Sequence, residues 1–361
     1  MIDFQALLVT LGLLLCIVAL TTAAAIANKI YSNREEDSKK EFLIRLRRYF
    51  LMLKTGVPED RREGMGQIVH TFTGRWSELA AEEVSEIELS LRLDVLRALE
   101  EQGVIARYLK HARSPMKWTR AHALRILGEL KVPTSVPTLL QALADRDPDV
   151  RNVAARALGR MKLQAAEEAL VELLGKHDQA VSARIAAICI EMGPRTAPLL
   201  IRSLREGTPK ARFWSARILG EIQDARATRS LGDATHDSDA EVRSASVWAL
   251  GMIADRSTAP IVMPLLDDSA WYVRAHAAEA LGKIADPDAI PKLAKAMEDH
   301  SWWVRRNALD ALVRIGAPAK QALLDTLESR DRFARESAAE GLAVLGVPIP
   351  SGTVTSETGG R

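Results

Sequence analysis

The sequence predicts an all-α protein, a solenoid of helical repeats preceded by one transmembrane helix. Three observations carry this prediction: a repeat period close to 31 residues, an apolar stripe of helical spacing within each repeat, and a charge-free run near the N-terminus. The chain has 361 residues and a formal net charge of +2. No segment of it shows the strict apolar and polar alternation of a half-buried strand.

One phrase recurs along the C-terminal three-quarters of the chain. Val273 to Asp286 reads V-R-A-H-A-A-E-A-L-G-K-I-A-D, and Val242 to Asp255 reads V-R-S-A-S-V-W-A-L-G-M-I-A-D. A fixed period indicates stacked repeats, each of which buries its apolar face against its neighbours. The position of the glycine in A-L-G recurs every 30 or 31 residues, at Gly128, Gly159, Ile190, Gly220, Gly251, Gly282, Val313 and Ala343.

Each repeat is predicted to contain two helices. Apolar residues stand one position before a recurrent arginine and 3, 6, 7 and 10 positions after it, which forms one stripe on a helix. An apolar run with a proline, such as Ile290-Pro291, opens the other half of the repeat, and proline suits the first turn of a helix. The arginines are Arg120, Arg151, Arg212, Arg243, Arg274, Arg305 and Arg335, and Ser182 replaces one of them.

The full phrase is D-x-D-x-x-V-R-x-x-A-x-x-A-L-G-x-I-x-D-P-x-A-I-P-x-L, clearest at Asp237–Leu265, Asp268–Leu293 and Asp147–Met161. With it the chain resembles HEAT-like repeat proteins of the short bacterial type, whose repeats also occur in phycobilisome lyases. The resemblance covers residues 115–346. It implies a right-handed α-solenoid of about eight to nine HEAT-like repeats. It says little about function, because one fold hosts many functions.

The predicted organisation has four parts. Residues 4–28 form a transmembrane helix, residues 29–81 a basic juxtamembrane helical linker, residues 82–346 the solenoid, and residues 347–361 a disordered tail without periodicity. The segment from Arg92 to Glu100 aligns with Arg120 to Gly128. It therefore predicts a degenerate first repeat, as expected for a unit that caps the stack.

The run from Phe4 to Asn28 contains no charged residue, and about 20 apolar residues suffice for a helix to cross a bilayer. The alternative is a signal peptide cleaved near Ala25-Ile26-Ala27. Signal peptides begin with basic residues, whereas Met1-Ile2-Asp3 has an acid and no base, so a retained anchor is favoured. Lysine and arginine follow the run but do not precede it. The positive-inside rule then predicts a single-pass protein of the inner (cytoplasmic) membrane, with the N-terminus outside and the repeats in the cytoplasm.

Residues 42–54 combine an apolar helical face with interleaved basic residues. They lie within residues 29–75, which carry 11 Lys or Arg and 7 Asp or Glu. The segment either lies on anionic lipid as an amphipathic helix or packs on the first repeat as a linker helix, and the sequence leaves both open. Its apolar face comprises Phe42, Leu43, Leu46, Tyr49, Phe50 and Leu53.

Motifs that carry catalysis are missing from the sequence. It has no Gly-rich phosphate loop, no Ser elbow and no Cys/His cluster with metal-ligand spacing. None of its seven His is followed by Glu, whereas the HEAT-like deoxyhypusine hydroxylases bind iron through His-Glu pairs. We therefore expect no enzymatic activity, no cofactor and no small-molecule substrate. His122 and His276 share one repeat position, which favours a role in packing or at a polar edge.

The recurrent arginine is expected to be structural. An aspartate precedes it in most units, and such a residue can cap the second helix and accept hydrogen bonds from the arginine of its own or a neighbouring unit. The resemblance to HEAT repeats implies an Asp–Arg ladder along the stack. The aspartates are Asp147, Asp239, Asp268, Asp299 and Asp331.

Two surfaces are candidate binding sites for a protein partner. In HEAT-like stacks the second helices line a concave groove, where one row of residues changes from basic through aromatic to acidic and suits an elongated, dipolar partner. The alternative surface is an edge of aromatic residues at the start of the second helices, where exposed Trp and Tyr favour an interface. The groove comprises Arg125, Arg156, Phe213, Arg217, Trp248, Glu279 and Asp310, and the edge comprises Trp271, Tyr272, Trp302 and Trp303, with Phe333 at the equivalent position.

The sequence thus predicts a membrane-anchored cytoplasmic scaffold or adaptor that binds a protein partner through the groove. The resemblance to membrane-anchored bacterial HEAT proteins implies an envelope or polysaccharide-synthesis assembly as the partner class. A bilin lyase-like enzyme and a nucleic-acid-binding HEAT-like protein are the alternatives. No residues mark a bilin pocket, and residues 76–361 carry 38 Lys or Arg against 39 Asp or Glu, which disfavours nucleic acid as a partner.

Overall fold

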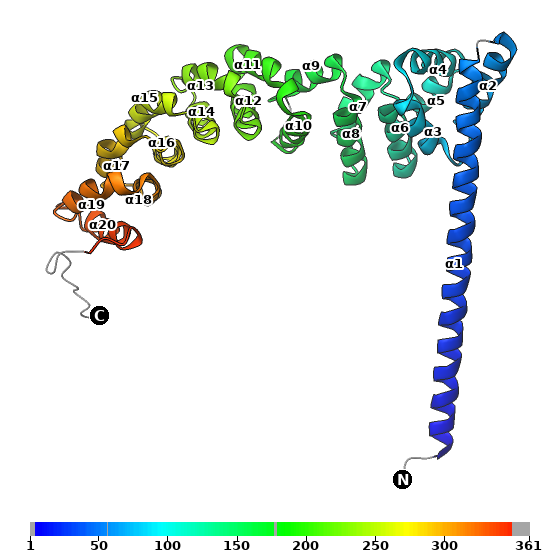
Figure 1. Ribbon diagram of the computed structural model, residues 1–361, viewed down its shortest axis with the longest axis horizontal. Coiled ribbons are helices and arrows are strands. Elements are labelled where there is room, and N and C mark those ends of the chain that lie inside the picture. The colour runs from blue at the N-terminus through cyan, green and yellow to red at the C-terminus, as the bar shows by residue number, and fades with distance from the viewer. Residues whose placement is uncertain (1–3, 56, 177–178, 349–361) are drawn as a thin grey trace. The chain divides into compact units, whose positions relative to one another are not determined.

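The computed structural model describes residues 4–55, 57–176 and 179–348, and helices are the only regular elements in these ranges. The chain forms two compact units, Met1–Val132 (unit 1) and Pro133–Arg361 (unit 2). Figure 1 shows the helices of both units in chain order. The predicted disordered tail, residues 347–361, lies outside the described residues except for Val347 and Pro348.

Unit 1 begins with one helix of 51 residues, α1 (Phe4–Lys54). Helix α1 packs on α2, α2 packs on α4, and α3 packs on α6. Proline stands in the first turn of α2, where its missing N–H is not needed. The other helices are α2 (Pro58–Thr71), α3 (Ser77–Glu86), α4 (Leu89–Glu101), α5 (Val104–His111) and α6 (Lys117–Glu129).

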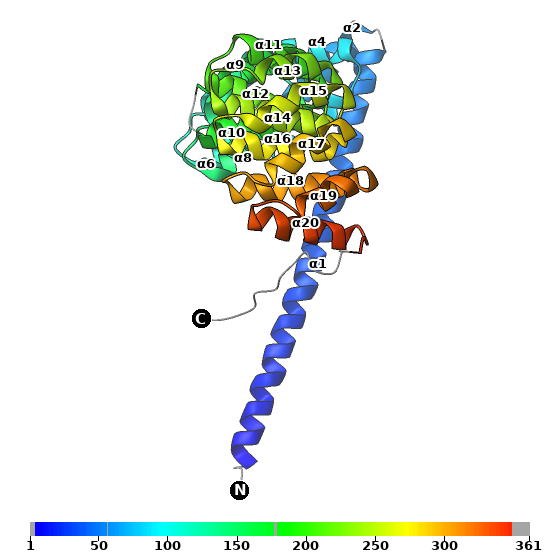
Figure 2. The same cartoon turned by 90° about the vertical axis from the view of Figure 1, so that its left-hand side faces the viewer.

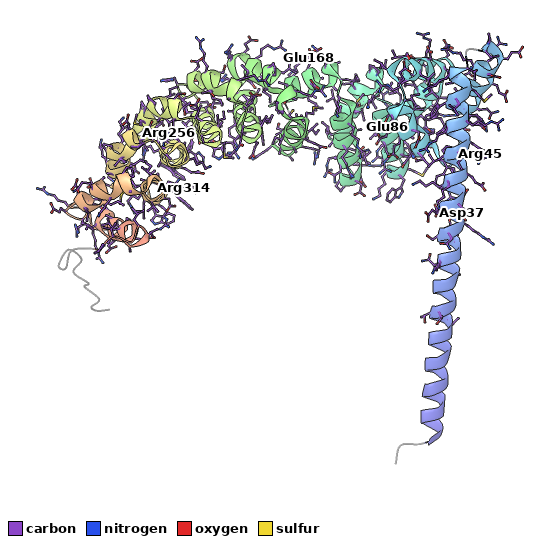
Figure 3. The ribbon with its side chains drawn as sticks, in the orientation of Figure 1. Asp37, Arg45, Glu86, Glu168, Arg256 and Arg314 are labelled. Carbon is purple, nitrogen blue, oxygen red and sulfur yellow. The ribbon has the colours of Figure 1, made fainter. Side chains whose placement is uncertain are left out.

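The last turns of α1 belong to the core of unit 1. Phe42, Leu46, Phe50 and Leu53 are buried, and the ring centroid of Phe42 lies 6.2 Å from that of Trp76. Arg45 lies on the exposed side of the same helix (Figure 3). Of the two alternatives for residues 42–54, the structure shows the packed linker helix, because an apolar face that is buried in protein does not contact lipid.

Among the residues that the structure describes, none belongs to a helix with the length and hydropathy required for a membrane span. The predicted transmembrane helix, residues 4–28, is therefore not confirmed. Helix α1 runs through these residues, but the side chains of residues 4–19, including Cys16, lie outside the described part of the chain.

Unit 2 repeats one motif of a short first helix, a turn and a second helix of 13 or 14 residues. The second helices are α8 (Pro148–Met161), α10 (Gln179–Met192), α12 (Pro209–Ile222), α14 (Ala240–Ile253), α16 (Trp271–Ile284), α18 (Trp302–Ile315) and α20 (Arg332–Val344). The first helices are α7 (Val136–Ala142), α9 (Gln164–Leu173), α11 (Ala197–Glu206), α13 (Thr228–Ala234), α15 (Ala259–Val262), α17 (Ile290–Ala296) and α19 (Lys320–Thr326). Short 3-10 turns precede most of the first helices, and a further one, η5 (Met263–Asp267), follows α15.

The helices of unit 2 form two layers. Each second helix packs on the second helix of the next repeat, from α8 to α20. The first helices pack on one another from α7 to α13 and again from α17 to α19, and η5 packs on α17. Within unit 2 the second helices lie on the inner side of the curve (Figure 1), and Figure 2 shows the stack from the α20 end. The predicted solenoid of helix pairs is confirmed, with the second helices on the concave side.

Glycine and alanine bring the inner helices close together. A Cβ atom added to Gly251 would lie 2.7 Å from the Cα atom of Ala280, and one added to Gly282 would lie 2.8 Å from the Cα atom of Ala311. These distances leave no space for a side chain, because the obstacle is backbone. The recurrence of A-L-G in the sequence follows from this contact.

The start of the inner row differs from the prediction. The alignment of Arg92 with Arg120 places the helix of Arg92 beside α6, but α3 packs on α6 instead. Arg92 lies on α4, which packs on α2 and α5 and buries Leu91, Val95 and Leu99. The predicted boundary between residues 81 and 82 falls inside α3. The alignment misled because an apolar stripe shows that a helix is packed but not which neighbour it packs on.

Candidate functional site: the inner groove and the aromatic edge

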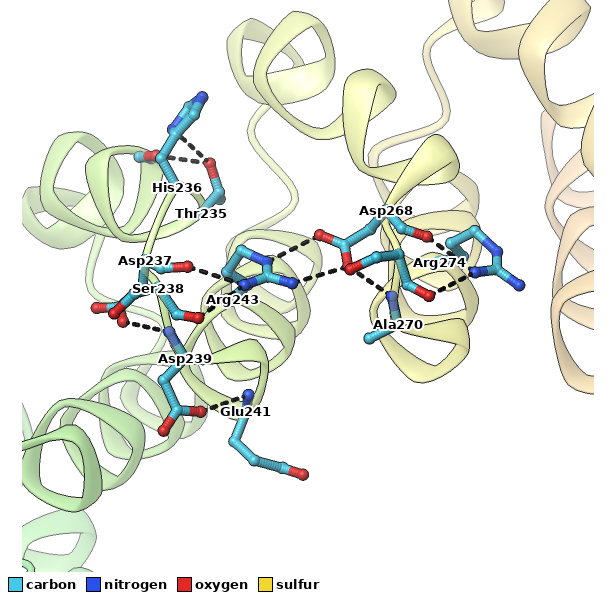
Figure 4. A network of polar contacts seen from close by, with 12 residues as sticks. Thr235, His236, Asp237, Ser238, Asp239, Glu241, Arg243, Asp268, Ala270 and Arg274 are labelled. Atoms are coloured by element: carbon cyan, nitrogen blue, oxygen red, sulfur yellow. Dashed lines mark hydrogen bonds and ion pairs between the residues drawn. The ribbon is translucent and has the colours of Figure 1, made fainter.

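A ladder of ion pairs joins successive repeats of unit 2 (Figure 4). Arg243 donates from Nε and Nη2 to the two carboxylate oxygens of Asp268, at 2.8 and 2.9 Å. Arg274 binds Asp299 in the same way at 2.7 and 3.0 Å, and Arg212 binds Asp237 at 2.7 and 2.8 Å. Both partners are mostly buried: the Arg274 side chain is 17% exposed and that of Asp299 13%. The predicted ladder is confirmed, and it links neighbouring repeats.

The carboxylates of the ladder remain ionised because of their partners. Burial by itself raises the pKa of Asp268, but hydrogen bonds from Arg243 and from the backbone amide of Ala270 outweigh it and lower the pKa below the ordinary value. The same balance lowers the pKa of Asp299, with Arg274 as the donor. Each arginine also donates from Nη1 to a backbone carbonyl, as Arg274 does to Asp268 O at 2.8 Å.

The recurrent aspartates have two roles that the sequence did not separate. Asp239 is the N-cap of α14 and accepts from the amide of Glu241 at 2.8 Å; Asp147 and Asp331 cap α8 and α20. The expectation that Asp268 and Asp299 cap a helix is wrong. Ala270 and Ser301 stand at those N-cap positions without a side-chain cap, and the two carboxylates bind the arginine of the preceding repeat.

The ladder of carboxylate pairs does not continue at Arg305. The position that holds Asp268 and Asp299 in earlier repeats holds Ser329. Arg305 still donates from Nη1 to Asp299 O at 2.8 Å, and its guanidinium carbon lies 4.9 Å from the ring centroid of Phe333. The last repeat thus exchanges an ion pair for a cation–π contact.

Trp248 occupies the floor of the predicted groove. The guanidinium carbon of Arg217 lies 3.6 Å from the ring centroid of Trp248. The indole also covers Gly220, since a Cβ atom there would come within 2.6 Å of Trp248 Cζ3. Trp248 and Phe213 are both partly buried, and burial lowers the pKa of Arg217. The aromatic area of the floor is therefore used in packing α12 against α14.

Three charged residues of the groove row, Arg217, Glu279 and Asp310, are paired within their own helices. Each pair is one turn apart, at the i and i+4 spacing that favours salt bridges on a helix. The row therefore lacks the basic-to-acidic gradient that the sequence predicted, because that prediction followed one column and omitted the residues that neutralise it. The pairs are Arg217–Glu221 at 4.0 Å, Glu279–Lys283 at 2.8 Å and Arg306–Asp310 at 3.2 Å.

The two remaining groove residues lie in different units. Arg125 belongs to unit 1, where Nη1 binds the carboxylate of Glu78 at 2.5 Å. Arg156 is an exposed residue of α8 in unit 2. The predicted groove site is consequently not one continuous set of residues within a single unit.

The aromatic edge is an exposed apolar feature of three consecutive inner helices. Here the term denotes Trp271, Tyr272, Trp302, Trp303 and Phe333, which stand in the first turns of α16, α18 and α20. The exposed fractions are 47% for Trp271, 56% for Trp302, 57% for Trp303 and 57% for Phe333. Tyr272 is partly buried, and burial together with Glu241 raises the pKa of Tyr272.

A pocket of about 530 Å³ continues the aromatic edge toward α12. Phe213, Trp214, Asp239 and Glu241 line it, and Glu241 also contacts Tyr272. The sequence prediction omitted Trp214, although the adjacent pair Phe213-Trp214 resembles the aromatic pairs of the edge. The other lining residues are Gln179, Ser182, Pro209 and Lys210.

The two histidines at the shared repeat position make contacts between inner helices, as predicted. His276 Nδ1 lies 2.6 Å from Ser244 Oγ. In unit 1, His122 lies between Ser77 Oγ at 3.3 Å and Glu78 Oε1 at 2.9 Å, an order that serine hydrolases use. Ser77 is only 2% exposed, and the same Ser–His contact recurs in unit 2. We therefore assign it to helix packing.

Nothing in the described ranges suggests a metal centre or a reactive thiol. No three His, Cys, Asp or Glu side chains in those ranges are grouped so that they could hold a metal ion. Cys189 is buried in α10, and burial raises its pKa to about 12, so its thiol stays protonated at neutral pH.

The HEAT-repeat family matches residues 105–191, 196–272 and 259–343, which is more than half of the chain. The protein is therefore a member of the HEAT-repeat family. HEAT repeats commonly mediate protein interactions, and this solenoid suggests a protein-interaction scaffold. The narrower resemblance to phycobilisome lyases is not confirmed by this match.

No curated protein matches the sequence. Among solved structures, the chain is similar to an engineered protein, with a TM-score of 0.39 and 22% identity over 78% of this chain and 88% of the other. It is also similar to human deoxyhypusine hydroxylase in complex with glycerol, with a TM-score of 0.31 and 20% identity over 68% of this chain and 99% of the other. Similarity at this level carries no argument about function.

Proposed function

We propose that the protein is a non-enzymatic scaffold that binds a protein partner through the aromatic edge of unit 2. The observation that carries the proposal is the exposure of Trp271, Trp302, Trp303 and Phe333, about half of each side chain, on three consecutive repeats. Tryptophan is strongly enriched among interface hot spots. A patch of exposed tryptophan side chains is unfavourable in water, and a partner that buries the patch removes this contact with water.

The aromatic edge is a better candidate than the groove for a physical reason. Trp248 already stacks on Arg217 and covers Gly220, so a partner that covered it would gain little new apolar burial. The charges beside it are compensated by neighbours one turn away. The groove residues therefore serve mainly the stack, whereas the edge residues have free surface.

We also propose that residues 4–28 anchor the protein in the inner (cytoplasmic) membrane, with the repeats in the cytoplasm. The support is the charge-free run from Phe4 to Asn28 and the lysines and arginines that follow it. An anchored scaffold raises the local concentration of its partner at the membrane. An envelope or polysaccharide-synthesis assembly is the partner class that the resemblance to membrane-anchored bacterial HEAT proteins supports.

Site-specific photocrosslinking in intact membranes tests the binding surface. A photoreactive amino acid at Trp303 is expected to capture a partner, whereas the same amino acid at Gln321, exposed on the outer helix α19, is the matched control and captures none. Capture from Gln321 alone, or from Trp248 but not from Trp303, would show that the edge is not the site.

Fractionation and protease protection test the anchor. The full-length protein is expected to stay with membranes until detergent is added, and a tag at the C-terminus is expected to survive protease in intact spheroplasts. Release without detergent would refute the anchor, and digestion of the tag would refute the cytoplasmic orientation.

A further inference from the structure

We infer that the segment recognised by the aromatic edge is an extended proline-rich stretch in the polyproline II conformation, with a basic residue at the end that reaches the pocket of Phe213 and Trp214. The inference rests on the proposed function and gives the chemistry of its partner.

The first argument is spacing. The aromatic residues of the edge stand at the same positions of three consecutive repeats, on the neighbouring inner helices α16, α18 and α20, so one interhelical distance separates each set from the next. Packed helices lie about 8–10 Å apart. A polyproline II helix advances 3.1 Å per residue with three residues per turn, about 9.3 Å per turn. Every third residue of such a segment therefore meets the next repeat.

Other conformations fit this spacing less well. A β-strand presents one face every second residue, about 6.7 Å, and so drifts out of register with the repeats. An α-helix, at 1.5 Å per residue, returns to the edge only about every seventh residue.

The second argument is the geometry of the rings. Trp302 and Trp303 meet edge to face with centroids 4.8 Å apart and an interplanar angle of 78°. Trp271 and Tyr272 form the same arrangement at 5.8 Å and 90°. Two successive repeats thus present two perpendicular aromatic pairs. Aromatic surfaces of this kind bind proline rings, which are rigid and lose little entropy on binding.

The third argument is charge. Asp239 and Glu241 line the pocket together with Phe213 and Trp214, while Lys210 is the one basic residue among the described residues that line it. Carboxylates beside aromatic faces favour an arginine or lysine through ion pairing and cation–π contact. At the opposite end of the edge, Arg305 lies over Phe333. The carboxylates at the pocket favour a basic residue of the partner there, whereas Arg305 at the opposite end disfavours one beside α20.

Synthetic peptides test the inference. The probe carries two basic residues at one end, followed by three prolines at three-residue intervals, and is made in both chain directions because a polyproline II helix is nearly symmetric in its contacts. The control peptide has alanine in place of the prolines. Binding is measured by fluorescence anisotropy with the full-length protein in mild detergent. The proline peptide is expected to bind at least about tenfold more tightly than the control.

Variants connect the binding to the edge. The double substitution Trp302→Ala and Trp303→Ala is expected to weaken peptide binding about tenfold or more. Glu241→Gln keeps a hydrogen-bonding group and removes the charge, so it should weaken binding about threefold and reduce its salt dependence. Trp118→Ala is the matched control, because Trp118 is a 71% exposed tryptophan of unit 1. The affinity of this variant for the peptide should stay within about twofold of that of the unchanged protein.

Equal binding of the alanine peptide, unchanged binding by the double tryptophan variant, or tighter binding of a helical peptide would each overturn the inference. The proposed function has a separate readout. If no proline peptide binds but crosslinking from Trp303 captures a protein, the edge remains a protein-binding surface and only the polyproline chemistry is wrong. If neither occurs, both proposals fail.

Discussion

The inner groove and the aromatic edge of unit 2 carry aromatic residues from the same stack of repeats, but they use them differently. In the groove, Trp248 fills the space above Gly220 and lies 3.6 Å from the guanidinium of Arg217. At the edge, Trp302 and Trp303 are more than half exposed. Tryptophan thus stabilises the fold at one position and presents exposed apolar surface at another.

The difference comes from where each residue lies along its helix. A side chain in the middle of an inner helix faces the next inner helix, which approaches closely at glycine and alanine. Trp302 and Trp303 stand in the first turn of α18 and remain more than half exposed. Position within the repeat, more than residue type, therefore decides whether an aromatic ring contributes to stability or to binding.

The largest effect is expected where the inner helices touch. Gly251→Ala should lower the free energy of unfolding by about 2–3 kcal/mol, because the new Cβ atom would lie 2.7 Å from the backbone of Ala280. Gly159→Ala is the control: its nearest neighbour is the flexible carboxylate of Glu191 at 3.6 Å, so higher helix propensity should make it neutral or stabilising by up to about 1 kcal/mol. Chemical denaturation measures both, and equal losses would contradict the close contact.

Removing an arginine from the ladder should have the next largest effect. Arg274→Ala leaves the mostly buried Asp299 without its bidentate partner and should cost about 2 kcal/mol. Arg217→Ala loses a stacked cation–π contact in the groove and should cost only about 0.5–1 kcal/mol. Denaturation curves of the two variants give the comparison. The reverse order would mean that the ladder contributes less than the groove.

The two kinds of tryptophan should separate in paired measurements of stability and binding. Trp302→Ala with Trp303→Ala should weaken capture of the partner about tenfold or more and change stability by less than about 0.5 kcal/mol for each residue. Trp248→Ala should do the opposite, lowering stability by about 2–3 kcal/mol as a partly buried ring is lost and changing binding less than about twofold. If Trp248→Ala abolished binding without loss of stability, the groove would be the binding site.

Acid should weaken the ladder. The pKa of Asp237, Asp268 and Asp299 is lowered in the folded protein, although burial alone would raise it, because arginine hydrogen bonds outweigh the burial. These carboxylates therefore contribute stability that is complete above their unfolded pKa, about 3.8–3.9, and is lost as the pH falls through the lower folded pKa. Urea unfolding between pH 6 and pH 2 should show this loss, and it should shrink in Arg274→Ala. A stability that rises on acidification would contradict the assignment.

The smallest effect is expected from the groove charges. Glu279→Gln breaks an ion pair with Lys283 in which the Glu279 side chain is 37% exposed, so the stability change should be below about 0.5 kcal/mol. The rate of association with the partner should stay within about twofold, because the edge rather than the groove makes the contact. A strongly slowed, salt-dependent association would restore the groove to the binding site.

The sequence was most informative where a contact repeats. The resemblance to HEAT repeats implied the Arg–Asp ladder, and the recurrent Arg243 and Arg274 form it. The recurrence of A-L-G gave the period of the repeat. The sequence was less informative where the outcome depends on which of several helices packs against a given helix. The helix of Arg92 matched the repeat pattern, yet α3 takes the inner position next to α6.

The candidate site shows the same division. The sequence identified the aromatic edge by the positions of Trp271, Trp302 and Trp303, because each follows the same turn of its repeat. It did not identify Trp214 or the pocket that Trp214 shares with Glu241, since those residues come from different helices. It also overstated the charge of the groove row, because the neutralising residues lie one turn away in another column.

The sequence by itself determined the fold class, the two-helix repeat and the arginines of the ladder. These features follow from the periodicity of the sequence, and the same residue pattern recurs in each repeat. The tertiary structure alone decided that Asp268 and Asp299 bind arginine instead of capping a helix, and that the apolar face of residues 42–54 is buried. It also decided that Trp248 is packed while Trp302 is exposed. Such outcomes depend on which groups meet across repeats, and a one-dimensional pattern does not contain that information.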